Sequence, residues 1–290
     1  MCYNLQYMKV KMLTRCLAYA AVSAAFATEE PAPVPTAECV RKSGDTTTIT
    51  LPGGEEMEMI WCAPGKFSMG SPITEPGRFE DEKQHAVSIT KGFWLGKCEV
   101  TQRQWESVMR SNHSRFRSPD NPVENVSWHD CEMFVRRVNV ALGGLARFPT
   151  EAEWEYACRA GSGAPVAGSG QLPEMAWYDL NSDSQTHEVG RNKPNAWGFR
   201  DMHGNVLEWC ADWFSVPDGD TIDPKGPPSG SFKILRGGCW FFYERDCRSA
   251  YRLKREPSLR NCIFGFRLAC SDGAAVAKQG TSEGGAVAEK

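Results

Sequence analysis

The sequence lacks the features that mark several common functional classes. No two of its cysteines form a Cys-x-x-Cys pair, and its five histidines are scattered along the chain. Zinc ribbons, zinc hydrolases and thioredoxin-type redox sites therefore have no support, because each needs clustered cysteine or histidine side chains. The formal net charge is only −3 at pH 7, so nothing in the overall charge indicates nucleic acid as a partner.

Long apolar runs are also missing. An apolar stretch at residues 16–27 is too short to cross a bilayer, which needs roughly 20 apolar residues, and no later segment approaches that length. The stretch follows Met8 and three basic residues, and it ends in the small-x-small sequence Ala-Phe-Ala. This pattern predicts a signal peptide over residues 1–27, no membrane span, and a secreted or periplasmic protein. The alternative is a retained amphipathic N-terminal helix, but the basic start and the small residues favour export.

The rest of the chain divides by composition into three parts. Residues 28–46 are rich in Pro, Glu and Thr and are interpreted as a linker, and residues 271–290 form a tail without large apolar side chains. Neither can bury enough apolar surface to offset the entropy of ordering, so both are expected to be disordered. Residues 47–270 are expected to form one domain. Ten of the 12 cysteines follow residue 27, and an even, high count in an oxidising compartment indicates disulfides.

Three helix starts are marked by pairs of capping side chains. Each pair has Ser or Thr first and Gln, Asp or Glu three residues later, where the two side chains satisfy free amides of the first turn. The pairs are Thr101 with Gln104, Ser127 with Asp130, and Thr150 with Glu153. The third helix is predicted to end near Gly161. The second carries an apolar face formed by Cys131, Phe134, Val135, Val138 and Leu142.

An alternating pattern before a turn predicts a β-hairpin. Val87 and Ile89 alternate with polar residues, residues 91–92 (Lys-Gly) offer a turn, and residues 93–95 are apolar again. Everything after Gly161 is rich in Gly, Pro, Asn and aromatic residues, with only brief strand-like runs. We therefore expect an irregular, loop-rich α+β single domain, held together by aromatic packing, bound ions and disulfides.

Six segments, taken in order, resemble the formylglycine-generating enzyme family, also known as the sulfatase-modifying factor family. They are residues 67–70 (FSMG), 99–102 (EVTQ), 122–128 (PVENVSW), 148–157 (FPTEAEWEYA), 201–209 (DMHGNVLEW), and a C-terminal signature at 235–238 (LRGG), 247–252 (CRSAYR) and 265–267 (GFR). One such match would be weak, but all of them occur in the family's order. The resemblance implies a fold related to C-type lectins, a scaffold that serves both enzymes and binding modules.

The resemblance implies a copper-dependent oxidase that converts a cysteine of an exported protein or peptide, such as a sulfatase, to formylglycine. Family enzymes hold the metal between two cysteine thiolates, which suit Cu(I) because it prefers soft sulfur ligands. Here Phe242 stands at the first cysteine position and Cys247 matches the second. Cys239 stands where serine is usual, and it could supply a sulfur only if the chain folds back. The catalytic pair is incomplete, and copper is expected only for an active oxidase.

A structural calcium ion is also implied by the resemblance. Its ligands would be the side chains of Asp201 and Glu208 and the backbone carbonyls of Gly204 and Val206. Hard oxygen ligands of this kind suit calcium. The alternative is that Glu208 is a solvated or salt-bridged acid.

Two disulfides are candidates. Cys158 and Cys270 lie near positions that are bridged in some enzymes of the resembled family. Cys210 is a candidate partner for Cys247, and a structural bond there would make Cys247 chemically inert.

Two functional hypotheses follow. The first is a formylglycine-generating-enzyme-like domain that acts on a protein cysteine. The second is a non-catalytic module that binds a peptide or glycan in a cleft near Cys247, and the missing thiol favours it physically. The aromatic residues that could line such a cleft, although aromatic side chains more often form the core, are Trp154, Trp197, Trp209, Trp213 and Trp240.

Four arginines of the C-terminal third have two possible roles. They could bind a substrate carboxylate through bidentate bonds, or pair structurally with Asp246 or Glu256. They are Arg248, Arg252, Arg260 and Arg267. His203 has no neighbouring ligand of its kind in the sequence, so no role is assigned to it.

Overall fold

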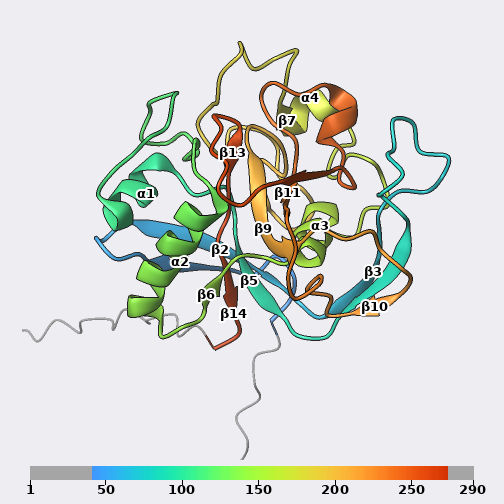
Figure 1. Cartoon of the computed structure of the whole chain (residues 1–290), viewed down its shortest axis with the longest axis horizontal. Helices are drawn as coiled ribbons and strands as arrows, with labels where there is room; N and C mark the ends of the chain where they lie inside the picture. The colour runs from blue at the N-terminus through green and yellow to red at the C-terminus, as the bar shows by residue number, and fades with distance from the viewer. Residues whose placement is uncertain (1–40, 274–290) are drawn as a thin grey trace, which may run out of the picture. The chain divides into compact units, whose positions relative to one another are not determined.

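A five-stranded antiparallel sheet brings the two ends of the domain together. In the computed structural model, which describes residues 41–273, its strand order is β1-β2-β5-β14-β6. The strands are β1 (Thr46–Thr50), β2 (Glu56–Cys62), β5 (Phe93–Gly96), β14 (Ala269–Ser271) and β6 (Ala146–Arg147). The last strand, β14, lies between β5 and β6 (Figure 1). The final strand of the described residues is therefore an interior strand of this sheet.

Two helices beside this sheet contact each other through aromatic side chains. Helices α1 (Gln102–Met109) and α2 (Trp128–Leu142) lie side by side in Figure 1. Trp105 of α1 stacks on Phe134 of α2, with ring centroids 5.4 Å apart, and Phe266 meets both rings edge-on. Edge-on and offset aromatic pairs add stability beyond the area that they bury.

All three capping predictions are confirmed. Thr101, Ser127 and Thr150 each accept a hydrogen bond from the third helical amide, and the side chain of that third residue accepts one from the backbone amide of the cap. The third helix, α3 (Glu151–Arg159), ends at a left-handed Ala160, one residue before Gly161. In α2 the predicted apolar face is buried apart from Leu142, which is half-buried against the same core.

Two smaller sheets support the C-terminal signature and the third helix. The four-stranded sheet has the order β12-β11-β9-β13, with β12 (Arg252–Arg255), β11 (Lys233–Arg236), β9 (Leu207–Trp213) and β13 (Phe264–Gly265). The three-stranded sheet has the order β10-β4-β3, with β10 (Thr221–Ile222), β4 (His85–Ile89) and β3 (Gly65–Met69).

The remaining elements are short. They are α4 (Leu172–Met175), the paired β7 (Ala176–Trp177) and β8 (His203–Gly204), and the 3-10 turn η1 (Glu244–Cys247). This mixture of short elements and long loops confirms the predicted irregular α+β domain. Between residues 41 and 273, no helix has both the length and the apolar character needed to cross a bilayer.

The predicted hairpin at residues 87–95 is wrong. The two strands exist, but β4 pairs with β3 and β10, whereas β5 pairs with β2 and β14. The turn between them carries the chain from one sheet to another. Gly92 permits this passage because a Cβ there would lie 2.1 Å from the Trp61 ring. The local pattern identified the strands, but their partners come from distant parts of the sequence.

The ordered domain begins before the predicted boundary. Residues 41–46, which the sequence assigns to a linker, contact the domain: the Gly44 amide donates to the Trp61 carbonyl at 3.0 Å, and the Arg41 guanidinium lies 4.2 Å from the Trp61 ring. At the other end Ser271 belongs to β14. The predicted signal peptide, residues 1–27, and most of the predicted linker and tail lie outside the described residues.

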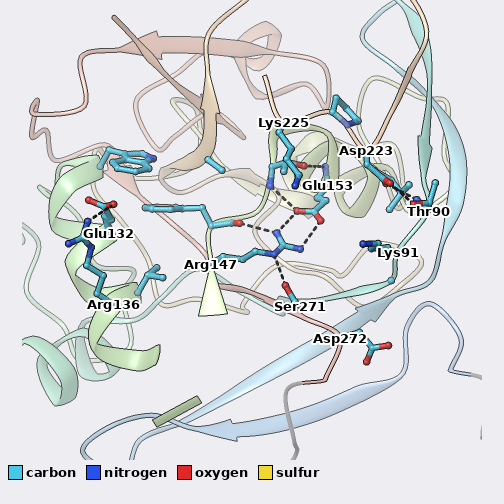
Figure 2. A pocket seen from close by; sticks show the side chains of 18 residues that line it. Thr90, Lys91, Glu132, Arg136, Arg147, Glu153, Asp223, Lys225, Ser271 and Asp272 are labelled. Carbon is cyan, nitrogen blue, oxygen red and sulfur yellow. Dashed lines mark hydrogen bonds and ion pairs between the residues drawn. The ribbon is translucent and has the colours of Figure 1, made fainter. Parts of the chain in front are cut away.

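A cavity of about 1060 Å³ lies between α2, β6 and the turn that joins β4 to β5 (Figure 2). It is separate from the segment that carries Cys239 and Cys247.

Candidate functional site

Two glycines after β11 allow the C-terminal signature to fold back on itself. Gly237 and Gly238 have φ values of 98° and 75°, a region that favours glycine. A Cβ at Gly238 would lie 2.6 Å from Cys247 Sγ and 2.7 Å from the Asp246 carbonyl oxygen. The chain therefore passes directly over Cys247, and this close approach places Cys239 and Cys247 in one neighbourhood.

Both cysteines are fully buried thiols. Burial raises the pKa of Cys247 to about 12, and it raises the pKa of Cys239 well above the usual value for a thiol. A thiolate, not a thiol, is the form that binds metals and attacks electrophiles. Without a bound metal, both side chains are therefore neutral thiols at neutral pH.

Phe242 occupies the position that matches the first family cysteine. Its ring is partly buried, packs in the cluster that contains Cys247, and meets the Tyr251 ring edge-on at 5.9 Å. It offers hydrocarbon where a second sulfur would be required. The pair of sulfurs that holds copper in the family enzymes is therefore not complete at these positions, and the residues present do not fit that centre.

Exposed aromatic residues cover the same segment. Phe241 is 60% exposed and Tyr243 is 65% exposed. Phe241 continues into a chain of ring contacts: its centroid lies 5.5 Å from that of Trp240, which lies 5.3 Å from that of Phe116. We call this group the aromatic surface; its exposed members are Phe79, Phe241 and Tyr243, and it also includes the half-buried Phe116 and Phe242 and the buried Trp240 and Tyr251.

A polar groove of about 620 Å³ adjoins the aromatic surface at Phe116. His187 stacks on Trp177 in this groove, with centroids 3.9 Å apart. Arg115 and Arg117 also line it, and neither has a carboxylate partner among residues 41–273. The groove therefore presents positive charge beside aromatic rings.

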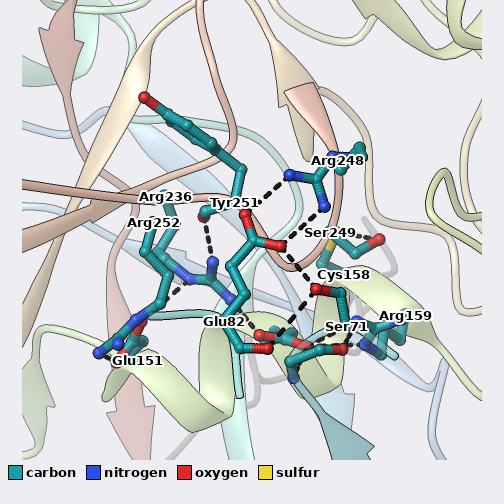
Figure 3. Close-up of polar contacts among 12 residues, drawn as sticks. Ser71, Glu82, Glu151, Cys158, Arg159, Arg236, Arg248, Ser249, Tyr251 and Arg252 are labelled. Carbon is teal, nitrogen blue, oxygen red and sulfur yellow. Dashed lines mark hydrogen bonds and ion pairs between the residues drawn. The ribbon is translucent and has the colours of Figure 1, made fainter. Parts of the chain in front are cut away.

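Buried ion pairs hold the aromatic surface in place (Figure 3). Arg248 binds Glu82 through two hydrogen bonds of 2.8 and 2.7 Å, and it reaches Glu75 at 2.6 Å. Arg252 binds Glu151 through bonds of 2.6 and 2.8 Å. These bonds fasten the β3–β4 loop and α3 to the chain that follows η1. Buried charges are tolerated because each is paired and hydrogen-bonded.

Comparison with known proteins places this geometry in a family. Residues 47–271 match the sulfatase-modifying factor enzyme 1-like domain. The chain belongs to this family. It is 35% identical to the formylglycine-generating enzyme of Streptomyces coelicolor over 52% of this chain and 53% of that protein. It is 29% identical to the serine/threonine-protein kinase pkn1 of Chlamydia pneumoniae over 73% of this chain but only 38% of that protein.

A solved structure of similar shape is Treponema denticola variable protein 1. It superposes with a TM-score of 0.72 at 31% identity, covering 78% of this chain and 99% of that protein. The predicted family and its lectin-like scaffold are thereby confirmed.

The two carboxylates that the family implies as calcium ligands, Asp201 and Glu208, lie near each other but have unequal partners. Glu208 is bound by Arg267 through two bonds of 2.6 Å and also accepts from the Trp154 indole at 2.7 Å. Asp201 has one buried oxygen without a partner, and both carboxylate oxygens of the neighbouring buried Glu99 lack one. Burial raises the pKa of Asp201 to about 6 and raises that of Glu99 well above its usual range.

The charges of this cluster require either a cation or protons. Three buried carboxylates, Glu99, Asp201 and Glu208, lie near one guanidinium, that of Arg267. No three His, Cys, Asp or Glu side chains among residues 41–273 are placed so that they could hold a metal together, so calcium would depend on backbone carbonyls such as those of Gly204 and Val206. Glu99 could not be assigned to this cluster from the sequence, because its proximity to Asp201 depends on the fold.

Neither predicted disulfide is formed. All nine cysteines between residues 41 and 273 are free thiols. The predicted partners lie in different core clusters: Cys158 and Cys210 in one, Cys270 in a second and Cys247 in a third. The tenth cysteine beyond the predicted signal peptide, Cys39, lies outside the described residues.

The other site residues considered from the sequence are mainly structural. Trp154, Trp209 and Trp240 are buried, whereas Trp197 and Trp213 are half-buried. All four arginines pair with acids, but with Glu75 and Glu82, Glu151, Asp130 and Glu208 rather than Asp246 or Glu256. The buried His203 accepts from the Ala167 amide at Nε2 and donates from Nδ1 to the Cys247 carbonyl.

Proposed function

We propose that this domain is a non-catalytic binding module that holds a segment of an exported protein partner on the aromatic surface. The proposal rests on a contrast within residues 239–247, between unreactive buried thiols and exposed aromatic rings. Phe242 stands where a thiol is required, and Cys239 and Cys247 are buried with raised pKa values, while Phe241 and Tyr243 are exposed. The segment is therefore better suited to contact than to redox chemistry.

Exposed aromatic side chains are effective anchors for a partner. Tyr and Trp are enriched among the residues that dominate binding energy, and aromatic rings bury large areas with few rotatable bonds. Soluble proteins rarely expose contiguous apolar patches without a binding role. Phe241 and Tyr243 lie on a segment that the buried pairs of Arg248 and Arg252 fix in position, so little conformational entropy would be lost on binding.

The adjoining groove indicates the chemistry of the partner. Arg115 and Arg117 are available to carboxylates, and the stacked His187 and Trp177 offer a flat surface. A peptide segment with acidic residues next to an apolar one would satisfy both regions. A sulfatase remains a candidate partner because the family includes formylglycine-generating enzymes.

The test is a selection of displayed peptides on the mature protein, followed by affinity measurement. Selected sequences should combine aromatic or aliphatic residues with Asp or Glu. Phe241→Ser/Tyr243→Ser should weaken their binding at least about tenfold, since hot-spot truncations cost roughly 2 kcal/mol each. The matched control is Val140→Ser, which removes an exposed apolar residue from α2. Equal weakening by the control, or no effect of the double variant, would contradict the proposal.

A parallel reaction addresses the oxidase hypothesis. The mature protein is incubated with Cu(I), oxygen and a Cys-x-Pro-x-Arg peptide, and the mass of the peptide is measured. We expect no oxidation. Copper-dependent oxidation that Cys247→Ser abolishes would establish an oxidase with a rearranged thiol site.

A further inference from the structure

The cavity between α2, β6 and the β4–β5 turn is large enough for an organic molecule. Its volume of about 1060 Å³ is at the upper end of the roughly 300–1,000 Å³ of small-molecule sites. It shares no lining residue with the aromatic surface or its polar groove. Its walls come from six separate segments of the chain, which include α2, β6 and the end of β14 (Figure 2).

The floor of the cavity is built from fixed apolar side chains. Trp128 stacks on Phe148 with centroids 4.9 Å apart and an angle of 15° between the rings. The Trp128 indole donates to the Cys210 carbonyl at 2.9 Å, which fixes its orientation. Buried Ile89 and Val135 complete the apolar lining. Phe148 stacks on Trp128 and the Lys233 ammonium lies 4.2 Å from the centroid of the same ring, so the apolar body of a ligand would meet the edges of the two rings together with Ile89 and Val135.

The acidic residues of the cavity are all engaged by other groups. Glu153 is bound by Arg147 through bonds of 2.6 and 2.7 Å, and Asp223 accepts from the amide of Thr90 at 2.7 Å and from its hydroxyl. The other two acids form ion pairs, Glu132 with Arg136 at 3.0 Å and Asp272 with Arg41 at 2.8 Å. Three of the four acids are therefore paired with an arginine, and the oxygens of Asp223 accept hydrogen bonds from Thr90.

Two lysines at the cavity are not held in ion pairs within the part of the chain that the structure describes. Lys91, in the β4–β5 turn, and Lys225, which follows β10, are exposed, and neither forms an ion pair with a residue between 41 and 273. The pKa of Asp223 is lowered first by its hydrogen bonds with Thr90 and then by the charges of Lys91 and Lys225, so both lysines lie near that carboxyl. Figure 2 shows both side chains near the cavity. Long, flexible ammonium groups of this kind bind the acid group of a ligand.

We propose that this cavity binds a small organic anion with a planar apolar body. The body lies against Trp128 and Phe148, and the acid group is bound by Lys91 and Lys225. Arg147 is held by Glu153, by Ser271 at 3.2 Å and by the Phe148 carbonyl at 3.0 Å. Arg147 therefore forms a fixed polar edge of the cavity, and its charge is already paired with that of Glu153.

The probes are 8-anilinonaphthalene-1-sulfonate and the neutral N-phenyl-1-naphthylamine, which has the same ring system without the acid. Binding is followed by fluorescence titration of the folded full chain. Lys91→Gln/Lys225→Gln should weaken binding of the sulfonate about tenfold or more and change binding of the neutral probe less than about twofold. The matched control, Lys66→Gln/Lys83→Gln, removes two exposed lysines elsewhere and should change neither affinity.

A second variant separates this site from the aromatic surface. Phe241→Ser/Tyr243→Ser should leave sulfonate binding unchanged, because neither residue lines the cavity. Sulfonate binding that is equal in wild type and Lys91→Gln/Lys225→Gln would overturn the proposal. So would binding that depends on Phe241 and Tyr243.

Discussion

Arg248 and Glu82, which are 166 positions apart in the sequence, bind each other through two hydrogen bonds of 2.8 and 2.7 Å while both side chains are almost completely buried. Glu75 shares the same guanidinium at 2.6 Å. The pair therefore fastens the β3–β4 loop to the segment that carries the aromatic surface.

Breaking this pair should destabilise the domain. Glu82→Gln leaves Arg248 with one buried carboxylate instead of two, and disruption of buried pairs typically costs about 3 kcal/mol or more. Urea unfolding monitored by tryptophan fluorescence measures the change. Arg245→Gln, at an exposed guanidinium beside Asp246, is the control and should change the unfolding free energy by less than about 0.5 kcal/mol. Equal effects of the two variants would contradict the role of the buried pair.

Gly238→Ala should be more damaging than an ordinary glycine replacement. The added Cβ would meet Cys247 Sγ at 2.6 Å and the Asp246 carbonyl at 2.7 Å, and φ is also positive. Gly143→Ala is a matched control, because Gly143 has φ 62° and no atom within 4 Å of its ideal Cβ.

The control isolates backbone strain from steric overlap. Gly143→Ala should cost about 1–2 kcal/mol from strain alone, and Gly238→Ala should cost at least about 2 kcal/mol more. The measurement is the free energy of unfolding in urea. Similar losses for the two variants would show that the chain over Cys247 can move aside.

The pH dependence of stability should include a contribution from His203. Burial, opposed by its bond to the Cys247 carbonyl, lowers the pKa of this histidine to about 4. Between pH 6.5 and 4 the unfolded chain therefore binds a proton that the folded chain does not, so stability falls as the pH decreases. The loss amounts to about 3 kcal/mol over this range.

His203→Gln removes the titrating group, so the variant should lose less stability than wild type between pH 6.5 and 4. The difference between wild type and variant excludes the contributions of Asp201 and Asp212 to the pH dependence of stability, because both proteins contain these acids. Their raised pKa values act in the opposite direction to that of His203. Parallel curves of unfolding free energy against pH would contradict the prediction.

Local signals were sufficient for some elements and not for others. Each capping box lies within four residues, so all three helix starts could be identified from the sequence. Strand partners and ion pairs depend on distant segments, which is why β4 and β5 were joined wrongly and why Glu75 and Glu82 were missed as partners of Arg248. Phe241 and Tyr243 carried no local signal, because an apolar loop residue can be buried or exposed.

Calcium should stabilise the fold if it balances the charges around Asp201. A ligand that binds only the folded state raises stability, so a chelator should lower the melting temperature of the purified protein. Asp201→Asn should abolish the response, since it removes the carboxylate with an open buried oxygen.

Asp201→Asn is a sharper test than Glu208→Ala, because loss of Glu208 would also leave the buried Arg267 without its partner. Asp183→Asn, at an exposed loop residue, is the control and should retain the response. A melting curve of wild type that a chelator does not change would contradict calcium binding.

Thiol alkylation tests whether Cys239 and Cys247 are unreactive in the folded protein. Cys262 is partly exposed, whereas Cys239 and Cys247 are fully buried and burial raises the pKa of both thiols. Alkylation requires both access and thiolate. Iodoacetamide at pH 8 should therefore modify Cys262 and leave Cys239 and Cys247 unmodified until the protein unfolds.

Peptide mapping by mass spectrometry locates each modified cysteine, and Cys262→Ser identifies the signal of the exposed thiol. Modification of all three in urea, but of Cys262 alone in buffer, would show that Cys239 and Cys247 are reduced yet shielded. A mass shift that links Cys247 to another cysteine would contradict the free thiols of the structure. Rapid alkylation of Cys247 in the native protein would contradict its burial and reopen the oxidase hypothesis, because an accessible thiolate at this position is the first requirement for that chemistry.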